Sequence, residues 1–241
     1  MRFTEVSQSL EQALRSESEE CERYVPAYGD VTELNTCRLI LDSVGRETLE
    51  EVARDAIDLL GTSVAIYEAN GDYAFGIFSS GWCQLLDDAS RQLCQTDDNS
   101  QALNCGRWLC HECCWKESAQ PSLWTGQSTD IVCVGGINLY AEPIYAGERV
   151  VGTINIGYGT PPTDPERITE LSKLFKVDED RLYQAAAAYQ PRPQALIDTA
   201  KKRLSISAKL LGHIVERSIA EHQLKQSEDN LRITFSSIGD A

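Results

Sequence analysis

The chain has 241 residues and a formal net charge of −15, from 22 Lys and Arg against 37 Asp and Glu. Nucleic-acid binding needs a basic surface, so this balance argues against a nucleic-acid partner. No window approaches the roughly 18 apolar residues of a membrane span, and the N-terminus lacks the apolar run of a signal peptide. We therefore expect a cytoplasmic protein that uses neither nucleic acid nor a membrane as a partner.

The first 45 residues are predicted to form an N-terminal helical segment. A polar helix with a thin apolar stripe is expected over 3–22, and a second helical run over 31–44. Residues 47–60 then show the apolar spacing of an amphipathic helix that ends at Gly61.

Residues 46–192 are predicted to form one α+β domain. A hairpin over 63–80 turns at Asn70-Gly71-Asp72, and a helix capped by Ser79 or Ser80 follows. A second helix begins near 109–112 and ends at Gly126. A strand over 129–133 and a hairpin over 137–158 bring the count to about five mostly antiparallel strands, and two short helices follow. This pattern predicts an antiparallel sheet with flanking helices.

A long helical pattern begins after Pro193. Apolar residues recur at intervals of seven, which predicts a parallel dimeric coiled coil over 193–230. The phase of the repeat changes across 218–223, which suggests a stutter. The two sets of apolar residues are Ile197, Leu204 and Leu211, and then Leu224, Leu231 and Ile238.

Nine cysteines in a chain without an export signal suggest free thiols, metal ligands or redox groups rather than structural disulfides. Cys21 and Cys37 lie in helical patterns far from the others and are expected to be ordinary small side chains. Cys83 and Cys94 lie on the helix that follows the first hairpin. The others lie in or beside the second helix, except for Cys133, which ends the next strand.

The cysteines of WLCHECCW could share a metal ion. Cys110 lies three residues before Cys113 and four before Cys114, so either pair fits one helix face. A tetrahedral zinc or iron site needs two further ligands. The sequence offers Cys83, Cys105, Cys133 and His111 for these places.

Other roles for these thiols stay open at this point. They could line an apolar pocket beside Trp108, Trp115, Trp124 and Tyr140, or form a disulfide or thiol switch. The start of a helix lowers the pKa of a nearby thiol, so Cys110 is a candidate reactive group. For His111 we expect a solvent-facing position rather than ligation.

No catalytic constellation is present in the sequence. Its glycine-rich segments do not match a phosphate-binding loop, and neither GxSxG nor HExxH occurs. A cysteine enzyme with Cys110 as nucleophile and His111 or Glu112 as helper is disfavoured, because adjacent helical residues point away from each other. We expect a non-enzymatic segment, whose parent protein could be a histidine kinase.

The cysteine stretch resembles the PocR sensory domain, a PAS-like or GAF-like ligand-sensing module. This family stands at the N-terminus of transcription regulators, histidine kinases and diguanylate cyclases. The resemblance covers roughly 49–189 and implies a sensor for a small organic molecule. It rests on Cys83 in GWCQLL, Cys110 and Cys114 in WLCHECCW, Cys133 in DIVCVGGI, Pro143-Ile144, and GERVVGTINIGYG.

The C-terminal residues LKQSEDNLRITFSSIGDA resemble the junction before a PAS domain in multi-sensor histidine kinases. This resemblance implies that 231–241 begin a further, truncated PAS domain. The expected partners are then a small-molecule or metal ligand, a second copy bound through the C-terminal helix, and a downstream PAS or kinase module.

We expect Cys83, Cys110, Cys114 and Cys133 to converge on one site, with Cys113 pointing elsewhere. The alternative function is a metal or thiol redox sensor without an organic ligand. A pure dimerisation scaffold is disfavoured by the clustered thiols. The predicted ligand-binding residues are Cys83, Trp108, Cys110, Cys114, Trp115, Cys133 and Tyr140, and the predicted zinc or iron ligands are Cys83, Cys110, Cys114 and Cys133.

Overall fold

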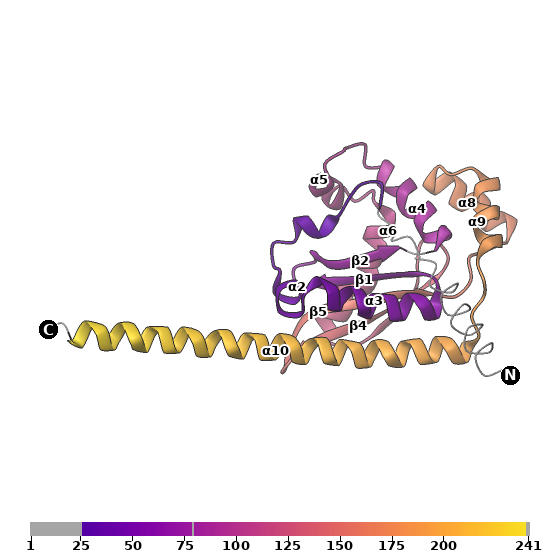
Figure 1. Cartoon of the computed structure of the whole chain (residues 1–241). Helices are drawn as coiled ribbons and strands as arrows, with labels where there is room; N and C mark the ends of the chain where they lie inside the picture. The colour runs from indigo at the N-terminus through magenta and orange to yellow at the C-terminus, as the bar shows by residue number, and fades with distance from the viewer. Residues whose placement is uncertain (1–25, 79, 240–241) are drawn as a thin grey trace, which may run out of the picture.

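The fold is α+β: five strands form one antiparallel sheet, helices flank it, and a long helix carries the C-terminus (Figure 1). The computed structural model describes residues 26–78 and 80–239. Within them no helix is long and apolar enough to cross a membrane. The helix expected over 3–22 and the last two residues of the expected PAS segment, 240–241, lie outside the described residues.

The sheet has the order β2-β1-β5-β4-β3, and every neighbouring pair is antiparallel. Both predicted hairpins are confirmed, as β1–β2 and β4–β5. The strands are β1 (Ser63–Glu68), β2 (Tyr73–Phe78), β3 (Thr129–Val132), β4 (Asn138–Ala146) and β5 (Arg149–Tyr158).

Nine α-helices, the 3₁₀ helix η1 and the π-helix η2 lie in the described part of the chain. They are η1 (Val31–Leu34), α2 (Leu39–Val44), α3 (Arg46–Leu60), α4 (Gly81–Gln92), α5 (Asn99–Asn104), α6 (Leu109–Glu112), η2 (Cys113–Ala119), α7 (Gln120–Thr125), α8 (Pro165–Phe175), α9 (Glu179–Ala188) and α10 (Gln194–Gly239).

Both faces of the sheet are covered, which explains why every residue of β1 is buried. Val64 and Ile66 pack with α3 and α10 on one face. Ala65 and Tyr67, which alternate with them along the strand, pack against η2 on the other. The sheet therefore lies between α10 and the cysteine-bearing helices.

The predicted coiled coil over 193–230 needs a correction. Ile197, Leu204 and Leu211 are buried in the core with the sheet, α2 and α3, and do not face a second chain. A seven-residue spacing fits a helix lying across its own sheet as well as a coiled-coil seam, so the pattern did not separate them. The C-terminal part of the helix projects from the body (Figure 1), and its described side chains are exposed from residue 220 on. The side chain of Ile238 lies outside the described residues.

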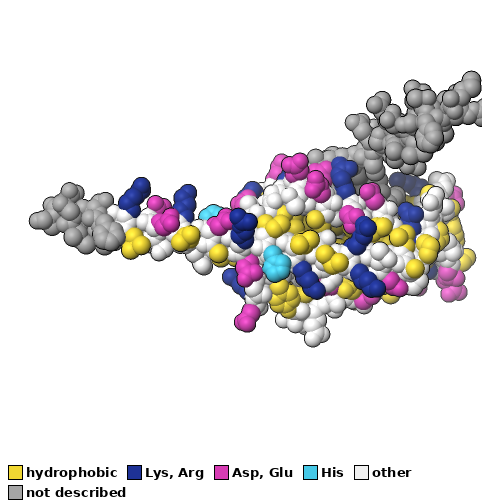
Figure 2. Space-filling model, turned by 60° about the horizontal axis from the view of Figure 1, so that its bottom comes forward, with side chains coloured by type: hydrophobic (Ala, Val, Ile, Leu, Met, Phe, Trp, Pro, Cys, Tyr) yellow, Lys and Arg dark blue, Asp and Glu magenta, His cyan; other side chains and the backbone are white. Residues whose placement is uncertain are grey.

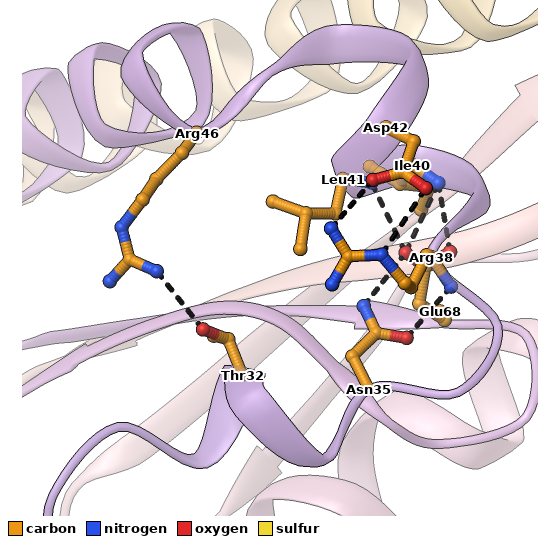
Figure 3. Close-up of polar contacts among 8 residues, drawn as sticks. All are labelled: Thr32, Asn35, Arg38, Ile40, Leu41, Asp42, Arg46 and Glu68. Atoms are coloured by element: carbon orange, nitrogen blue, oxygen red, sulfur yellow. Dashed lines mark hydrogen bonds and ion pairs between the residues drawn. The ribbon is translucent and has the colours of Figure 1, made fainter.

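The helix expected over 31–44 is interrupted. It consists of the 3₁₀ turn η1 and the short helix α2, because Glu68 at the end of β1 reaches between them (Figure 3). Its buried carboxylate accepts hydrogen bonds from the backbone N–H groups of Ile40, at 2.9 Å, and Leu41, at 3.2 Å. The side chain of Asn35 donates a third, at 3.1 Å. This carboxylate joins α2 to the sheet.

Replacing Glu68 by glutamine is expected to lower the free energy of unfolding by about 2–4 kcal/mol, because an NH₂ group then faces buried N–H donors. The matched control is Asp42→Asn, which removes an exposed ion pair with Arg38 beside it (Figure 3) and should cost about 0.5 kcal/mol or less. Urea denaturation measures both. Equal losses in the two variants would contradict this account of Glu68.

Candidate functional site

Helix α4 supplies the first wall of the site. The side chain of Ser80 caps the helix by accepting a hydrogen bond from the N–H of Cys83, at 3.0 Å, which confirms one of the two expected caps. This start places Trp82, Cys83 and Leu86 on the buried side of α4. The indole N–H of Trp82 donates to the carbonyl of Gly135, at 3.1 Å, so α4 is bonded to the loop after β3.

Helix α6 and the π-helix η2 supply the second wall. They carry Cys110, Cys113 and Cys114, and the side chain of Asn155 on β5 donates to the carbonyl of Cys114, at 3.1 Å. The π-helix adds a residue to each turn, and such turns are frequent at functional sites. With this wider turn Cys113 and Cys114 both face the cavity, so the expectation that Cys113 points elsewhere is wrong.

The loop between β3 and β4 closes the third side. Gly136 has φ +85° and donates its N–H to the carbonyl of Cys133, and the N–H of Cys133 donates to the carbonyl of Ile137, at 2.7 Å. This tight turn needs a residue in the left-handed conformation, which explains why position 136 is a glycine. The N–H of Val134 points at the sulfur of Cys113, at 3.4 Å.

These three walls enclose a small cavity of about 30 Å³. All four cysteines expected to converge line it, and Cys113 is a fifth. The remaining lining is apolar apart from Ser63 and backbone. Trp82 and Cys113 were missed from the sequence, although Trp82 stands next to Cys83 on a predicted helix. The lining residues are Ser63, Trp82, Cys83, Leu86, Cys110, Cys113, Cys114, Cys133, Val134, Gly135, Ile137 and Leu139.

Burial keeps these thiols protonated. It raises the pKa of Cys83 and of Cys113 to about 12 and also raises that of Cys133. The pKa values of Cys110 and Cys114 lie well above the ordinary value, through burial and then through neighbouring acidic groups. The expected lowering at Cys110 is therefore wrong, because burial outweighs a helix start of only one turn.

The metal ion expected at Cys83, Cys110, Cys114 and Cys133 finds no support in the present positions of the side chains. Within residues 26–78 and 80–239 no group of three or more His, Cys, Asp or Glu side chains could hold a metal ion. Protonated thiols are also poor ligands, since metals bind the thiolate. The zinc or iron site stays a prediction.

Three of the predicted ligand-binding residues lie outside the cavity walls. Trp108 packs against Cys94 and Tyr28, and Trp115 stacks on Tyr67. Tyr140 lies on the opposite face of the sheet, toward α10. Trp124, the other aromatic candidate, is 72% exposed. Alternation along β4 and the turn of the helix place these rings away from the thiols.

A buried acid beside the cavity was not anticipated. Asp87, one residue after Leu86 on α4, accepts hydrogen bonds from the indole N–H of Trp108, at 2.7 Å, and from the hydroxyl of Tyr28, at 2.5 Å. Burial raises its pKa to about 7, although these two hydrogen bonds oppose the shift. The sequence signal was an acidic residue among the apolar positions of α4, which is ambiguous because the next residue, Asp88, is also acidic.

His111 is buried, so the expected solvent-facing position is wrong. Its Nδ1 lies 3.0 Å from the hydroxyl of Tyr73, and its ring lies against those of Tyr73 and Trp108. Burial, with the charge of Lys116 adding to it, lowers its pKa to about 4. A neutral imidazole in this place is a packing and hydrogen-bonding group.

A second, open groove of about 710 Å³ lies between α4 and the helices α8 and α9, with Asp88, Lys176 and Arg181 among its lining residues. It is larger than the cysteine cavity, but its walls are solvated and mixed in charge. Ligand sites are typically enclosed and mostly apolar with few polar groups. The cysteine cavity matches this description in the composition of its lining, and the groove matches a ligand site in volume.

Residues 42–216 match the family described as the sensory domain found in PocR. The chain belongs to the PocR sensory domain family. No curated protein and no solved structure shows significant similarity to it. The PocR match continues to residue 216, which includes the part of α10 that packs on the sheet. The family match therefore continues past residue 192, where the sequence places the end of the sensor domain.

Proposed function

We propose that this PocR domain is the input domain of a signal-transduction protein and binds a small ligand in the cysteine cavity. The observation that carries the proposal is the convergence of five thiols on one mostly apolar cavity whose wall continues into β3. A mostly apolar lining with a few polar groups is typical of ligand sites.

The lining favours an uncharged, mostly apolar molecule of few heavy atoms. No charged side chain lines the cavity, and its thiols are neutral at physiological pH. A volume of about 30 Å³ holds roughly one water-sized group, so a larger ligand must push the walls apart. A metal ion would have to displace the thiol protons first, so we place the organic ligand ahead of the metal and redox alternatives.

Contacts between β3 and α10 support transmission of the ligand state. Asp130 on β3 accepts a hydrogen bond from the ammonium of Lys201 on α10, at 2.5 Å, and one from the hydroxyl of Tyr158, at 2.5 Å. The ammonium also lies over the rings of Tyr158 and Tyr140, 4.0 and 4.9 Å from their centroids. Because the cavity residue Cys133 directly follows β3, movement of this wall acts on α10 through the strand.

A second contact joins the sheet to α10. Glu142 on β4 accepts hydrogen bonds from Ser205 of the helix, at 2.9 Å, and from the hydroxyl of Tyr140, at 2.7 Å. Tyr140 thus belongs to the connection with α10. A ligand can shift the helix only by the difference in its affinity for two packings of these contacts.

The exposed side of α10 supports a homodimer. Leu210, Leu224 and Leu231 are 58%, 62% and 55% exposed, and they share one heptad position with Arg217. This seam keeps its register from the body into the projecting part, so no stutter is needed. Figure 2 shows hydrophobic groups on the α10 side of the body and along the projecting helix. A projecting helix is marginal alone in water, which favours a second copy beside it.

Breaking this seam should dissolve the dimer. Leu224→Glu is expected to weaken self-association at least tenfold, because two carboxylates would face each other in the seam. Gln226→Glu adds the same charge two positions away, outside the seam, and should leave association unchanged. Light scattering with dilution measures both. A wild-type chain that is monomeric at tens of micromolar would contradict the dimer.

We infer that the output is a PAS or histidine-kinase module following α10, as the resemblance of the C-terminal residues implies. A cysteine enzyme is less well supported: Cys110 is protonated, and Nδ1 of His111 faces Tyr73. A cytoplasmic location accords with a thiol-rich sensor.

Ligand binding is tested with a panel of small uncharged molecules, and with Zn²⁺ and Fe²⁺ separately, read by tryptophan fluorescence and thermal shift. Gly135→Ala should abolish the response, because the new methyl group would lie 2.7 Å from Leu86 and 3.5 Å from the sulfur of Cys133. Gly81→Ala is the matched control, since open space surrounds that position. Equal responses in both variants would place the ligand elsewhere.

A further inference from the structure

Two cysteines outside the cavity form a close pair. The sulfurs of Cys94 and Cys105 lie 2.8 Å apart, and both residues are free thiols. Cys94 follows the end of α4, and Cys105 ends α5 just before Gly106. A disulfide bond is about 2.05 Å long, so the sulfurs need to approach by only about 0.8 Å.

We propose that Cys94 and Cys105 are a peroxide-sensitive pair that forms a reversible disulfide. Cys105 is exposed and is the attacking thiol, whereas Cys94 is buried and is the resolving thiol. The reagent is a peroxide, either hydrogen peroxide or an organic hydroperoxide.

The surroundings distinguish the two thiols. Burial tends to raise the pKa of Cys105, but a hydrogen bond with Cys94, the N–H groups of Arg107 and Trp108, and the charge of Arg107 together lower it. The pKa of Cys94 is raised, first by burial and then by its contact with Cys105. In the described part of the chain Cys105 is the one cysteine whose pKa is lowered, and thiolates are what peroxides oxidise.

The reaction balances in two steps. The Cys105 thiolate attacks one peroxide oxygen and breaks the O–O bond, which gives a sulfenic acid and, after protonation, water or an alcohol. The sulfur of Cys94 then attacks the sulfenic sulfur and displaces hydroxide, which takes up the Cys94 proton and leaves as water. Two thiols lose two electrons, and the peroxide is reduced by the same two.

The disulfide would tie two walls of the cavity together. Cys94 lies just beyond α4, which carries Cys83 and Leu86, and Cys105 leads into α6, which carries Cys110. This step rests on the proposed function. We expect the cavity to open less readily in the oxidised form, so that oxidation of the pair slows ligand entry.

The pair is tested on the full chain, reduced and then exposed to one to five equivalents of hydrogen peroxide. Non-reducing digestion and mass spectrometry should find the Cys94–Cys105 linked peptide, and dithiothreitol should remove it. In Cys94→Ser, dimedone should trap a sulfenic acid at Cys105. Cys37→Ser removes another exposed thiol and should leave the linked peptide unchanged.

Arg107→Gln should slow formation of the linked peptide by about three- to tenfold, because a lost positive charge raises the pKa of Cys105. Oxidation that falls first on Cys37 or on the cavity cysteines, without the linked peptide, would overturn the proposal. This readout needs no ligand, so it stands or fails independently of the proposed function. The coupling to the cavity is measured separately: oxidation should slow labelling of Cys110 and Cys133 by a maleimide, and an unchanged rate would contradict it.

Discussion

Replacing Gly212 by alanine is expected to lower the free energy of unfolding by about 3 kcal/mol or more and to loosen α10 from the sheet. The helix crosses β4 at this glycine, where an added Cβ would collide with the backbone carbonyl of Tyr145. Backbone cannot move aside as a flexible side chain can, so the helix has to shift. Urea denaturation measures the loss, and trypsin cleavage near Lys201 to Arg203 measures the loosening.

The sign of the change in the free energy of unfolding of Gly212→Ala distinguishes a tightly packed position from an open one. In an open helical position, alanine in place of glycine stabilises by up to about 1 kcal/mol. A more stable Gly212→Ala variant would therefore contradict the close packing of α10 on β4. Gln226→Ala, on the projecting part of the same helix, is the control and should change stability by about 0.5 kcal/mol or less.

Asp87 and His111 should give two opposing pH dependences of stability. The pKa of Asp87 is about 7 in the folded protein against about 3.9 unfolded, so its ionisation lowers stability as pH rises from 4 to 7. The pKa of His111 is about 4 folded against about 6.5 unfolded, so its protonation lowers stability as pH falls from 6.5 to 4. Their effects nearly cancel in the wild type between pH 4 and 6.5.

Removing either group should expose the effect of the other. Asp87→Asn keeps an acceptor for Trp108 and should leave a stability that rises with pH from 4 to 6.5, relative to wild type. His111→Phe should leave a free energy of unfolding that falls as pH rises from 4 to 7, relative to wild type. Each change in the free energy of unfolding should amount to about 3–4 kcal/mol across its pH window, measured by urea denaturation at several pH values. Parallel profiles for both variants and wild type would contradict the burial of these two groups.

The sequence predicted the sheet well because local signals marked it. The turn at Asn70-Gly71, the glycines of the second hairpin and the cap at Ser80 each define an element boundary through backbone preferences. Both hairpins, the capped α4 and the α+β class were therefore predictable. The interruption between η1 and α2 was not, because it depends on Glu68 from a distant strand.

The candidate site was predictable in its cysteines and less so in its neighbours. Cys83, Cys110, Cys114 and Cys133 line one cavity as expected. Cys113 joins them because a π-helix replaces the ideal spacing that excluded it. The pKa values of the thiols depend on burial in the assembled core, which a helix-terminus argument at Cys110 does not include.

The long helix shows where periodicity stops being informative. Ile197, Leu204 and Leu211 follow a heptad, yet they pack on the sheet, while Leu210 and Leu224 are exposed at another heptad position. Both sets fit a seven-residue repeat, and only the sheet's position decides which faces inward.

Hydrogen exchange tests most directly whether the state of the cysteine cavity reaches α10. In a chain with Cys21, Cys37, Cys94 and Cys105 changed to serine, methyl methanethiosulfonate would convert cavity thiols to methyl disulfides, which exceed about 30 Å³ and must move the walls. We predict faster amide exchange in the loop 133–137 and in α10 over 197–215, with the α10 response reduced by Lys201→Met. Faster exchange around the cavity with unchanged exchange throughout α10 would contradict the account.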